Sequence, residues 1–440
     1  MRFTLDIADL APGGEGTAAQ GGRPVFVPFA APGDRVEAEV PPGEGAAHAS
    51  LLRVVEGGPD RVSPPCRHFG PAFGGEEDRL CGGCEWLHLE YGLQLRQKER
   101  ALAEALRRIA RLAPGSYPLR PAVPSPARLR YRSRAKFHLD RTSNRLVFFR
   151  RRSHEPVRLS ECQLLVPELD GLREAVGPAL SQARLAPREV ALEWSDHQAA
   201  GAALLRFPEV GDGVRRRAED LLAAVPHLAG VVLDADGDGR VKPAPVLIGA
   251  PVLLHERVPG QPGPGIARSR PDVFQQANRS ANAGLVRVAL DLLRPDGEDV
   301  LELFCGSGNF TAPLARRARS VSAVEVQGPA LDLARADVGG GAVRFFAGDA
   351  LVLGGAFARE GRRFGGVLLD PPREGMRGLG PLLRDLAAPR AVYVSCDPAT
   401  FARDLKAAAA VGYRAAEVVP VDMFPQTHHV ECVALLERDG

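Results

Sequence analysis

The 440-residue chain is 45% hydrophobic and 25% charged, a balance typical of soluble globular proteins that excludes a largely disordered chain. One hydrophobic core seldom organises this length, so two or three domains are expected. The first twenty residues lack a basic start followed by an apolar run, and no stretch approaches the roughly 18 uncharged apolar residues of a membrane helix. We therefore expect a cytoplasmic protein without membrane partners, whose seven cysteines are free rather than disulfide-bonded.

The net charge of +2 conceals a strongly basic segment. Between Leu93 and Glu161 there are 18 Arg or Lys residues and 4 Asp or Glu residues, so this stretch carries about +14 and the remainder about −12. A basic stretch on a near-neutral protein predicts a face that binds a polyanion. The alternative is a solvated, arginine-rich surface with no partner.

Residues 1–58 have the pattern of a small β-barrel. The short apolar runs FTLDIADL, PVFVPF, DRVEAEV and ASLLRVV are separated by turns rich in glycine and proline. Short strands at this spacing predict an OB-like barrel. Barrels of this kind commonly bind single-stranded nucleic acid.

An amphipathic helix is predicted over residues 93–113, ended by Pro114 and Gly115. Its apolar face is formed by Leu95, Leu102, Leu106 and Ile109, and arginines occupy the opposite face.

Residues 128–160 predict a β-hairpin that turns across 142–144, with arginine on one face. The interleaved aromatic residues are Tyr131, Phe137, Phe148 and Phe149, and we expect Phe137 or Tyr131 to stack on bases of a single-stranded nucleic acid. Mixed strands and helices continue from 188 to 258.

From about residue 270 the pattern changes to alternating strands and helices, which predicts a doubly wound α/β domain. The fold expected for the whole chain is thus multidomain. An OB-like β-barrel spans 1–58, an α+β central domain with a cysteine-bearing loop spans 59–268, and an α/β domain spans 269–440. The predicted helix near 94–113 lies within the range of the central domain in the sequence.

A candidate cofactor turn lies in the run DVLELFCGSGNFT, where an apolar strand precedes Gly306 and Gly308. Glycines at a strand end let the backbone approach a ligand closely. Glu325 ends the next strand and could accept hydrogen bonds from ribose hydroxyls, and Asp349 ends the third strand, where it could reach an adenine edge. The pyrophosphate pattern G-x-G-x-x-G is not satisfied, which favours S-adenosylmethionine over a dinucleotide. The alternative is a glycine turn that binds nothing.

Three acidic or thiol residues are candidates for chemistry in the α/β domain. Cys396 lies at the end of an apolar strand just before a helix, where the helix N-terminus is expected to lower the thiol pKa. Asp370 begins the stiff sequence Asp-Pro-Pro-Arg after another strand, whereas methyltransferases that act on amino groups carry an Asn-Pro-Pro type sequence. Glu431 begins the last apolar strand and is a candidate base with a pKa raised by burial. A core cysteine and a solvent-exposed strand-end glutamate are the alternatives.

The cysteines outside this domain are Cys66, Cys81, Cys84 and Cys162. The C-x-x-C pair supplies two ligands, and the other two residues could complete four. Four thiolates suit a zinc ion or an iron–sulfur cluster, and spacing does not choose between them.

Taken together, these motifs resemble the uracil-C5 RNA methyltransferase family, in its iron–sulfur-containing branch with an N-terminal TRAM barrel. The resemblance covers nearly the whole chain. It is carried by the runs GGEGTAAQGGRPVFVPFAAPGDRVEAEV, CRHFG, CGGCEWLHLEYGLQLRQK, VFQQAN, LELFCGSGNFT, GDA, DPPREG, SCDPATFARDL and DMFPQTHHVE.

The resemblance implies a role for each matching residue. The nucleophile would be Cys396 and the base Glu431, because carbon 5 of uracil becomes nucleophilic only after a thiolate adds to carbon 6. Contacts to S-adenosylmethionine would come from Gln276, Phe304, Asn309, Glu325, Asp349 and Asp370, beside the two glycines. A [4Fe–4S] cluster would be held by Cys66, Cys81, Cys84 and Cys162. Cys66 and Cys81 are usually closer together in the family, but doubling a flexible loop costs only about 0.6 kcal/mol.

The resemblance also implies a substrate. The branch that carries both the cluster and the TRAM barrel favours 23S ribosomal RNA, and a transfer RNA uridine is the alternative. The helix near 94–113 is expected to pack on the catalytic domain. We expect a monomer that binds no DNA. A rival of another class is a catalytically silent RNA-binding or assembly factor.

Overall fold

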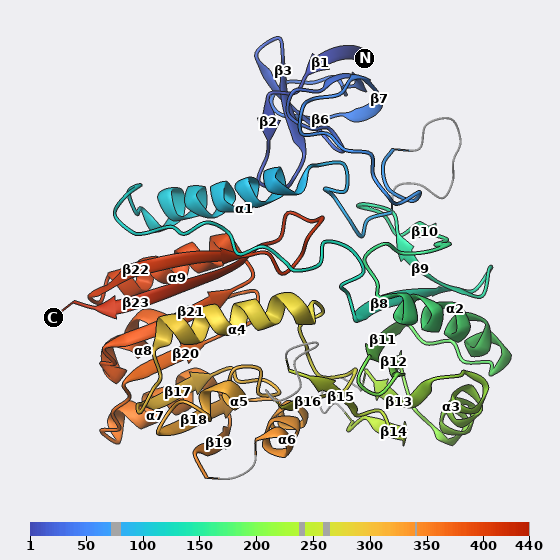
Figure 1. Cartoon of the computed structure of the whole chain (residues 1–440). Helices are drawn as coiled ribbons and strands as arrows, with labels where there is room; N and C mark the ends of the chain where they lie inside the picture. Colours follow the sequence, from blue (N-terminus) through green and yellow to red (C-terminus); the bar gives the residue numbers. More distant parts are fainter. Residues whose placement is uncertain (72–80, 237–242, 258–264, 339–340, 440) are drawn as a thin grey trace.

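The computed structural model describes residues 1–71, 81–236, 243–257, 265–338 and 341–439. Figure 1 shows three parts: a group of short strands at the N-terminus, a green α+β part, and a yellow-to-red part built on a large sheet. Helix α1 lies between the N-terminal strands and the rest. No helix in these ranges has the length and apolarity needed to cross a membrane. All seven cysteines are free thiols, as predicted.

The N-terminal part consists of two small sheets with strand orders β1-β5-β7 and β2-β3-β4-β6. Alternate side chains point inward, so that Val36 and Ala38 of β5 are fully buried while their neighbours are exposed or half-buried. The four predicted runs are confirmed as strands, since they contain β1, β2, β4, β5 and β7, whereas β3 and β6 were not predicted. The strands of residues 1–58 are β1 (Arg2–Asp6), β2 (Asp9–Leu10), β3 (Gly16–Gln20), β4 (Arg23–Val27), β5 (Arg35–Glu39), β6 (Ala47–His48) and β7 (Ser50–Glu56).

The helix predicted over 93–113 is shorter and changes pitch. It runs as α1 (Tyr91–Ala105) and continues as one π-helical stretch, η1 (Leu106–Ala110), which Arg111 ends in a left-handed conformation. The wider turn shifts the register, so Ala110 is buried and Ile109 is 36% exposed. The prediction that Ile109 belongs to the apolar face was therefore wrong. Leu102 and Leu106 are buried as predicted, and Leu95 is half-buried.

The central part has a seven-stranded sheet with the order β10-β9-β8-β11-β12-β13-β14, and helices α2 and α3 pack on it. The predicted hairpin is confirmed as β8 and β9, which pair with Asp140 opposite Arg145. The elements are β8 (Arg134–Asp140), β9 (Arg145–Phe149), β10 (Pro156–Val157), α2 (Pro167–Gln182), β11 (Glu189–Ser195), β12 (Ala200–Phe207), α3 (Asp212–Ala224), β13 (Leu228–Ala235) and β14 (Val246–Gly249), followed by a separate hairpin of β15 (Leu253–Glu256) and β16 (Ile266–Ser269).

The C-terminal part is the predicted doubly wound α/β domain. Its sheet has the order β19-β18-β17-β20-β21-β23-β22, parallel up to β21 and antiparallel at β23. The elements are α4 (Arg279–Leu293), β17 (Asp299–Leu303), α5 (Thr311–Leu314), β18 (Ser320–Glu325), α6 (Gly328–Asp337), β19 (Val343–Ala347), α7 (Ala350–Arg359), β20 (Gly366–Leu369), α8 (Leu379–Leu386), β21 (Arg390–Ser395), α9 (Pro398–Ala409), β22 (Tyr413–Val421) and β23 (Glu431–Arg438).

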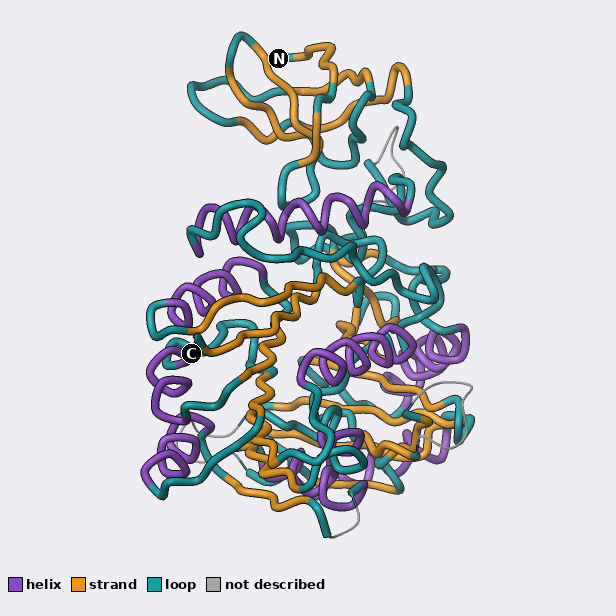
Figure 2. Tube along the Cα trace, turned by 60° about the vertical axis from the view of Figure 1, so that its left-hand side comes forward, coloured by secondary structure: helices purple, strands orange, loops and turns teal. Residues whose placement is uncertain are grey.

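Two cores cover the two faces of this sheet. Helices α7, α8 and α9 contribute to one core and helices α4, α5 and α6 to the other. Leu102 and Leu106 join the first core, so α1 packs on the C-terminal sheet (Figure 2). The chain that follows α1 runs beside β22, with parallel bridges from Leu119 to Val418 and from Val123 to Val421.

Candidate active site

The turn after β17 adopts a conformation that few residue types tolerate. Gly306 and Gly308 have φ values of 54° and 89°, in the left-handed region that favours glycine. A Cβ on Gly308 would lie 3.3 Å from the Cβ of Ala334, whereas one on Gly306 would point into open space. Phe304 also has a positive φ of 62°, which costs a non-glycine residue roughly 1–2 kcal/mol. Strain of this kind clusters at ligand sites.

Glu325 ends β18, as predicted, and is held beside this turn. Its Oε2 accepts a hydrogen bond from the backbone N–H of Gly306 at 3.0 Å, and its Oε1 accepts one from Gln327 at 2.8 Å. Both backbone groups fix the direction of the carboxylate and leave lone pairs on each oxygen. The carboxylate is thus preorganised to accept ribose hydroxyls.

Asp349 does not end the third strand, as the sequence had suggested. Strand β19 stops at Ala347, and Asp349 is the N-cap of α7. Its Oδ1 accepts hydrogen bonds from the N–H groups of Leu351 and Val352 at 2.9 and 3.0 Å. One oxygen therefore stabilises the helix start, and Oδ2 is left for a ligand.

Gln275 and Gln276 face the same cavity as Asn309. The Nε2 of Gln275 donates to the hydroxyl of Ser307 at 2.6 Å and to the carbonyl of Arg268 at 3.2 Å. Gln276 makes no side-chain hydrogen bond within the described ranges, so its amide is available to a ligand. The amides of Asn282 and Asn309 bond to each other, at 2.7 and 3.0 Å.

Strand pairing brings the two residues proposed for chemistry together. Ser395 of β21 pairs with Cys432 of β23 in an antiparallel ladder. The next residue along β21 is Cys396 and the preceding one on β23 is Glu431, so these two lie opposite each other at the end of the ladder. Asp370, which directly follows β20, is near enough for its charge to raise the pKa of both.

The thiol of Cys396 is not activated in the way the sequence suggested. Burial, followed by the charges of Glu431 and Asp370, raises its pKa to about 11. The N-terminus of α9 is capped instead by Asp397, whose carboxylate accepts hydrogen bonds from Ala399 and Thr400 at 2.9 Å each. A cap carboxylate already compensates the helix dipole. The prediction of a lowered pKa was therefore wrong for the protein without ligands.

Glu431 is 3% exposed, and burial raises its pKa to about 8, as predicted in direction. Burial also raises the pKa of Asp370 to about 7. A third carboxyl, that of Glu302 near the end of β17, was not predicted from the sequence, and burial raises its pKa to about 8. Neither oxygen of Glu302 has a hydrogen-bond partner in the part of the chain that is described, although the Thr311 side chain lies nearby. The sequence did offer a signal for Glu302, because it is a charged residue at an inward-facing position of an apolar strand.

Phe274 was also missed. It is 72% exposed in the loop before α4, two residues from Gln276. An exposed aromatic ring beside a ligand cavity is costly in water and is suited to stacking. Tyr131 and Phe137, which had been expected to stack on bases, are 5% and 0% exposed and belong to the interior, so that expectation was wrong.

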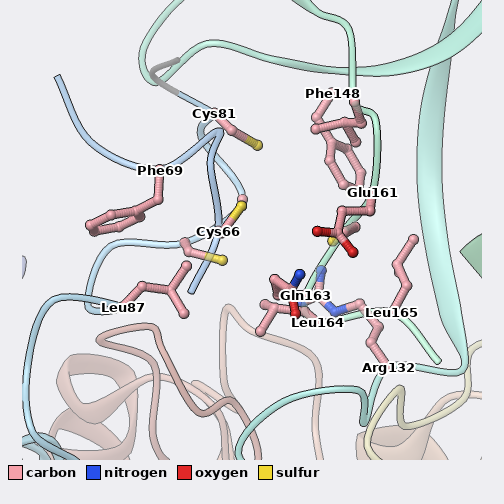
Figure 3. Close-up of a pocket in the computed structure, with 14 residues that line it drawn as sticks. Cys66, Phe69, Cys81, Leu87, Arg132, Phe148, Glu161, Gln163, Leu164 and Leu165 are labelled. Atoms are coloured by element: carbon pink, nitrogen blue, oxygen red, sulfur yellow. The ribbon is translucent and has the colours of Figure 1, made fainter. Parts of the chain in front are cut away.

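The four remaining cysteines gather at one cavity, far from Cys396 in sequence, whose volume is about 460 Å³ when the space open to solvent is included. In Figure 3 the sulfurs of Cys66 and Cys81 point into this space, across from Phe148 and Glu161. Burial raises the pKa of all four thiols, that of Cys81 to about 12, and neighbouring thiols raise the pKa of Cys66, Cys81 and Cys84 further. Within the described ranges no three His, Cys, Asp or Glu side chains already form a metal-coordinating group. Residues 72–80, which make the Cys66–Cys81 spacing long, lie outside those ranges.

The chain is similar in sequence to known RNA methyltransferases. The family model described as tRNA (Uracil-5-)-methyltransferase matches residues 90–345 and 359–439. The 23S rRNA (uracil(1939)-C(5))-methyltransferase RlmD of Pseudomonas putida is 37% identical, with 98% of this chain and 93% of that protein covered. The chain belongs to the uracil-C5 RNA methyltransferase family.

A second relative and one solved structure are also similar to this chain. The protein of the same name from Pectobacterium atrosepticum is 33% identical, over 99% of this chain and 94% of its own length. The crystal structure of the Pyrococcus abyssi tRNA (uracil-54, C5)-methyltransferase in complex with S-adenosyl-L-homocysteine matches 99% of this chain and 100% of its own, with a TM-score of 0.72 and 24% identity. That likeness shows the fold: a multidomain methyltransferase. Membership makes the protein an S-adenosylmethionine-dependent enzyme that acts on RNA.

Proposed function

We propose that this enzyme transfers the methyl group of S-adenosylmethionine to carbon 5 of a uridine in 23S ribosomal RNA. The observation that carries the proposal is the strand register that sets Cys396 opposite Glu431, with Asp370 beside them. The choice of ribosomal RNA rests on relatives that share 33–37% identity over nearly the whole chain and carry that substrate in their names. Transfer RNA, named for the family model and for the Pyrococcus abyssi structure, is the alternative.

The residues at the cavity fit the proposed methyl donor. Glu302, Asp370 and Glu431 are carboxyl groups whose pKa burial raises, and a cationic ligand would favour their ionised forms. We assign Glu325 to the ribose, Asp349 to the adenine, and Gln276, Phe304, Asn309 and Asp370 to further contacts around the glycine turn. S-adenosylmethionine supplies an electrophilic methyl group on a sulfonium centre when it is bound.

The chain's own residues then act in order. Cys396 reacts as its thiolate: the sulfur bonds to carbon 6 of uracil, the double bond between carbons 5 and 6 opens, and its electron pair makes carbon 5 nucleophilic. After carbon 5 has been methylated, the carboxylate of Glu431 removes the remaining proton from it, and the bond to sulfur breaks. Because the pKa of Cys396 is about 11 and that of Glu431 about 8 in the free protein, both are mainly protonated at pH 7. Ligand binding is therefore expected to promote their ionisation.

Trapping the covalent intermediate tests this function. Glu431→Gln should accumulate a protein–RNA adduct that survives denaturing electrophoresis when S-adenosylmethionine and a 23S rRNA fragment are supplied. Cys396→Ala is the matched control and should give neither adduct nor 5-methyluridine. Methylation by Cys396→Ala would overturn the mechanism, and methylation of tRNA transcripts in place of the 23S fragment would overturn the substrate. If the wild-type protein never methylates uridine, the RNA-binding or assembly-factor reading replaces this proposal.

We further propose that Cys66, Cys81, Cys84 and Cys162 hold a [4Fe–4S] cluster. Four thiols line one cavity whose other walls are largely apolar, with Phe69, Leu87 and Phe148 among them. Arg132 lines the same cavity and its Nε has no hydrogen-bond partner within the described residues, so its charge would offset a negative cluster. A zinc ion bound by the same thiols is the alternative.

We assign RNA recognition to two surfaces. The first is the N-terminal pair of sheets, which we interpret as a TRAM barrel. The second is the outer face of the β8–β9 hairpin, where the rings of His138 and Phe149 stack at 4.0 Å with an interplanar angle of 17°. Both rings are half-buried, and Lys136 and Arg145 are exposed nearby on the same strands. An aromatic pair among cations suits a single-stranded base and its phosphate.

A further inference from the structure

Beside the glycine turn lies a cavity of about 710 Å³, including its open mouth, whose walls carry four arginines. Three groups of residues line it: Arg257, Ala267 and Arg268, the chain from Gln275 into the first turns of α4, and residues between Ser307 and Arg316. The catalytic pair Cys396 and Glu431 does not line it. The cavity therefore borders the glycine turn and does not include the two reacting residues.

Two of the four arginines are neutralised and two are not. Arg257 and Arg268 share the buried carboxylate of Asp337, at 3.0 and 2.8 Å. Arg279 and Arg316 form neither an ion pair nor a hydrogen bond within the described residues. Two carboxylates, those of Glu193 and Asp196, act on Arg279 through their charge, but both lie beyond ion-pair distance.

The guanidinium of Arg279 is partly removed from water and has no ion-pair partner among the described residues. Arg279 is half-buried at the start of α4, and burial lowers its pKa to about 10. Removing a guanidinium from water is unfavourable unless an anion compensates it. Arg316 is exposed at the rim and adds a second positive charge. The cavity is therefore suited to a carboxylate or a phosphate.

The position of the cavity favours a carboxylate. Gln276 and Asn309, to which we assign cofactor contacts, line the same cavity, and Ser307 of the glycine turn faces it. Glu325, the proposed ribose ligand, bonds to the other side of the turn through Gly306. S-adenosylmethionine with its ribose at Glu325 carries one anionic group, the α-carboxylate at its amino-acid end.

We propose that the guanidinium groups of Arg279 and Arg316 bind the α-carboxylate of S-adenosylmethionine in this cavity. The inference rests on the proposed function, because it takes the glycine turn as the cofactor site. Arg279 supplies the inner contact and Arg316 the outer one. Both act on binding, and neither reaches the reacting carbon.

Binding of two ligands to the full-length protein, measured by calorimetry, tests the assignment. S-adenosylhomocysteine has the carboxylate, and 5′-methylthioadenosine lacks the whole amino-acid end. Arg279→Met should weaken S-adenosylhomocysteine binding by about tenfold to a hundredfold, the range for a lost charged hydrogen bond, and leave 5′-methylthioadenosine binding unchanged. Arg316→Met, at an exposed position that folding does not require, should give a smaller loss of about threefold or more. Arg287→Met, an exposed arginine of the same helix, is the matched control and should change neither.

Each other outcome has a defined meaning. Unchanged S-adenosylhomocysteine binding in Arg279→Met and Arg316→Met overturns the inference while leaving the proposed function intact. If these variants instead lose affinity for the 23S rRNA fragment alone, the cavity serves an RNA phosphate and the inference is also overturned. Wild-type protein that binds neither small ligand would overturn the proposed function itself.

Discussion

Lys98 and Asp422 form a fully buried ion pair between residues 324 positions apart in the chain. The ammonium of Lys98 also donates to the carbonyl of Phe424 at 3.0 Å, and the hydroxyl of Tyr91 donates to the second oxygen of Asp422 at 2.7 Å. These bonds attach α1 to the loop that leads into Glu431. The helix is therefore part of the framework that positions the proposed base.

Removing one partner of this pair should be severe. Lys98→Met leaves the carboxylate of Asp422 buried without its cation, so we expect the free energy of unfolding to fall by about 3–5 kcal/mol in urea titrations. Arg96→Ala, which breaks the exposed pair with Asp60, is the control and should cost less than about 1 kcal/mol. If Lys98→Met lowered the free energy of unfolding as little as the control does, Lys98 would not be needed to neutralise the buried Asp422.

The rate of methylation should depend on the ionisation of Glu431. Burial raises its pKa to about 8, so the carboxylate form needed for a base increases with pH up to that value. We expect kcat/KM for RNA to rise with pH, by about fiftyfold between pH 6 and 8 from the ionisation of Glu431 alone, and to keep rising above pH 8 because the Cys396 thiolate is also required. A profile that is flat over this range, measured with S-adenosylmethionine well below saturation so that the free enzyme is sampled, would show that Glu431 does not limit the free enzyme.

Glu302 should lower stability at neutral pH. Its pKa is about 8 in the folded protein against a usual 4.5, so the folded form retains a proton that the unfolded chain releases. Stability is thus fully retained below pH 4.5 and falls as pH rises to about 8, by an amount on the order of 3–5 kcal/mol. Glu302→Gln removes the titration, so the variant should melt at a higher temperature than wild type at pH 8 and show little difference at pH 4.5. It should also bind S-adenosylmethionine more weakly. Equal pH dependence in the two proteins would contradict this account.

The cysteine cavity should load iron. Protein purified without oxygen is expected to be brown and to contain about four irons and four sulfides per chain. Cys84→Ser should lose most of that iron, whereas Cys432→Ser, which alters a buried cysteine of the catalytic sheet, should retain it. A colourless protein that contains one zinc instead would favour the zinc site.

The hairpin surface should contribute to RNA affinity by stacking. Phe149→Ala should weaken binding of the RNA substrate by about 1–3 kcal/mol, because a stacked base contributes that much. Leu247→Ala, an exposed apolar residue on the opposite edge strand of the same sheet, is the control. Affinity that is insensitive to Phe149 and to salt would remove this face from the interface.

Strong local patterns made much of the fold predictable. The alternating strands of residues 1–58, the β8–β9 hairpin and the α/β sheet follow from the period of apolar residues. Glu325 was located because a strand end and its spacing from the glycine turn are both visible in the sequence. The burial of Glu431 followed from its apolar neighbours.

The errors arose where tertiary context decides. Ile109 lost its place on the apolar face because one π turn shifted the helix register, and no residue type announces such a turn. Cys396 precedes a helix, as expected, but Asp397 caps that helix and nearby carboxyls set the thiol pKa. Phe137 and Phe149 belong to the same hairpin, and only the fold shows which ring faces the interior and which the surface.

The packing of α1 also sets where the protein can be divided. A fragment that starts at residue 269 would carry every residue assigned to methyl transfer, yet it would lack Leu102, Leu106 and Lys98. Part of the core on one face of its sheet would be exposed and Asp422 would have no cation. Engineers who want a minimal catalyst should therefore fuse residues 91–123 to the C-terminal domain instead of truncating by sequence order.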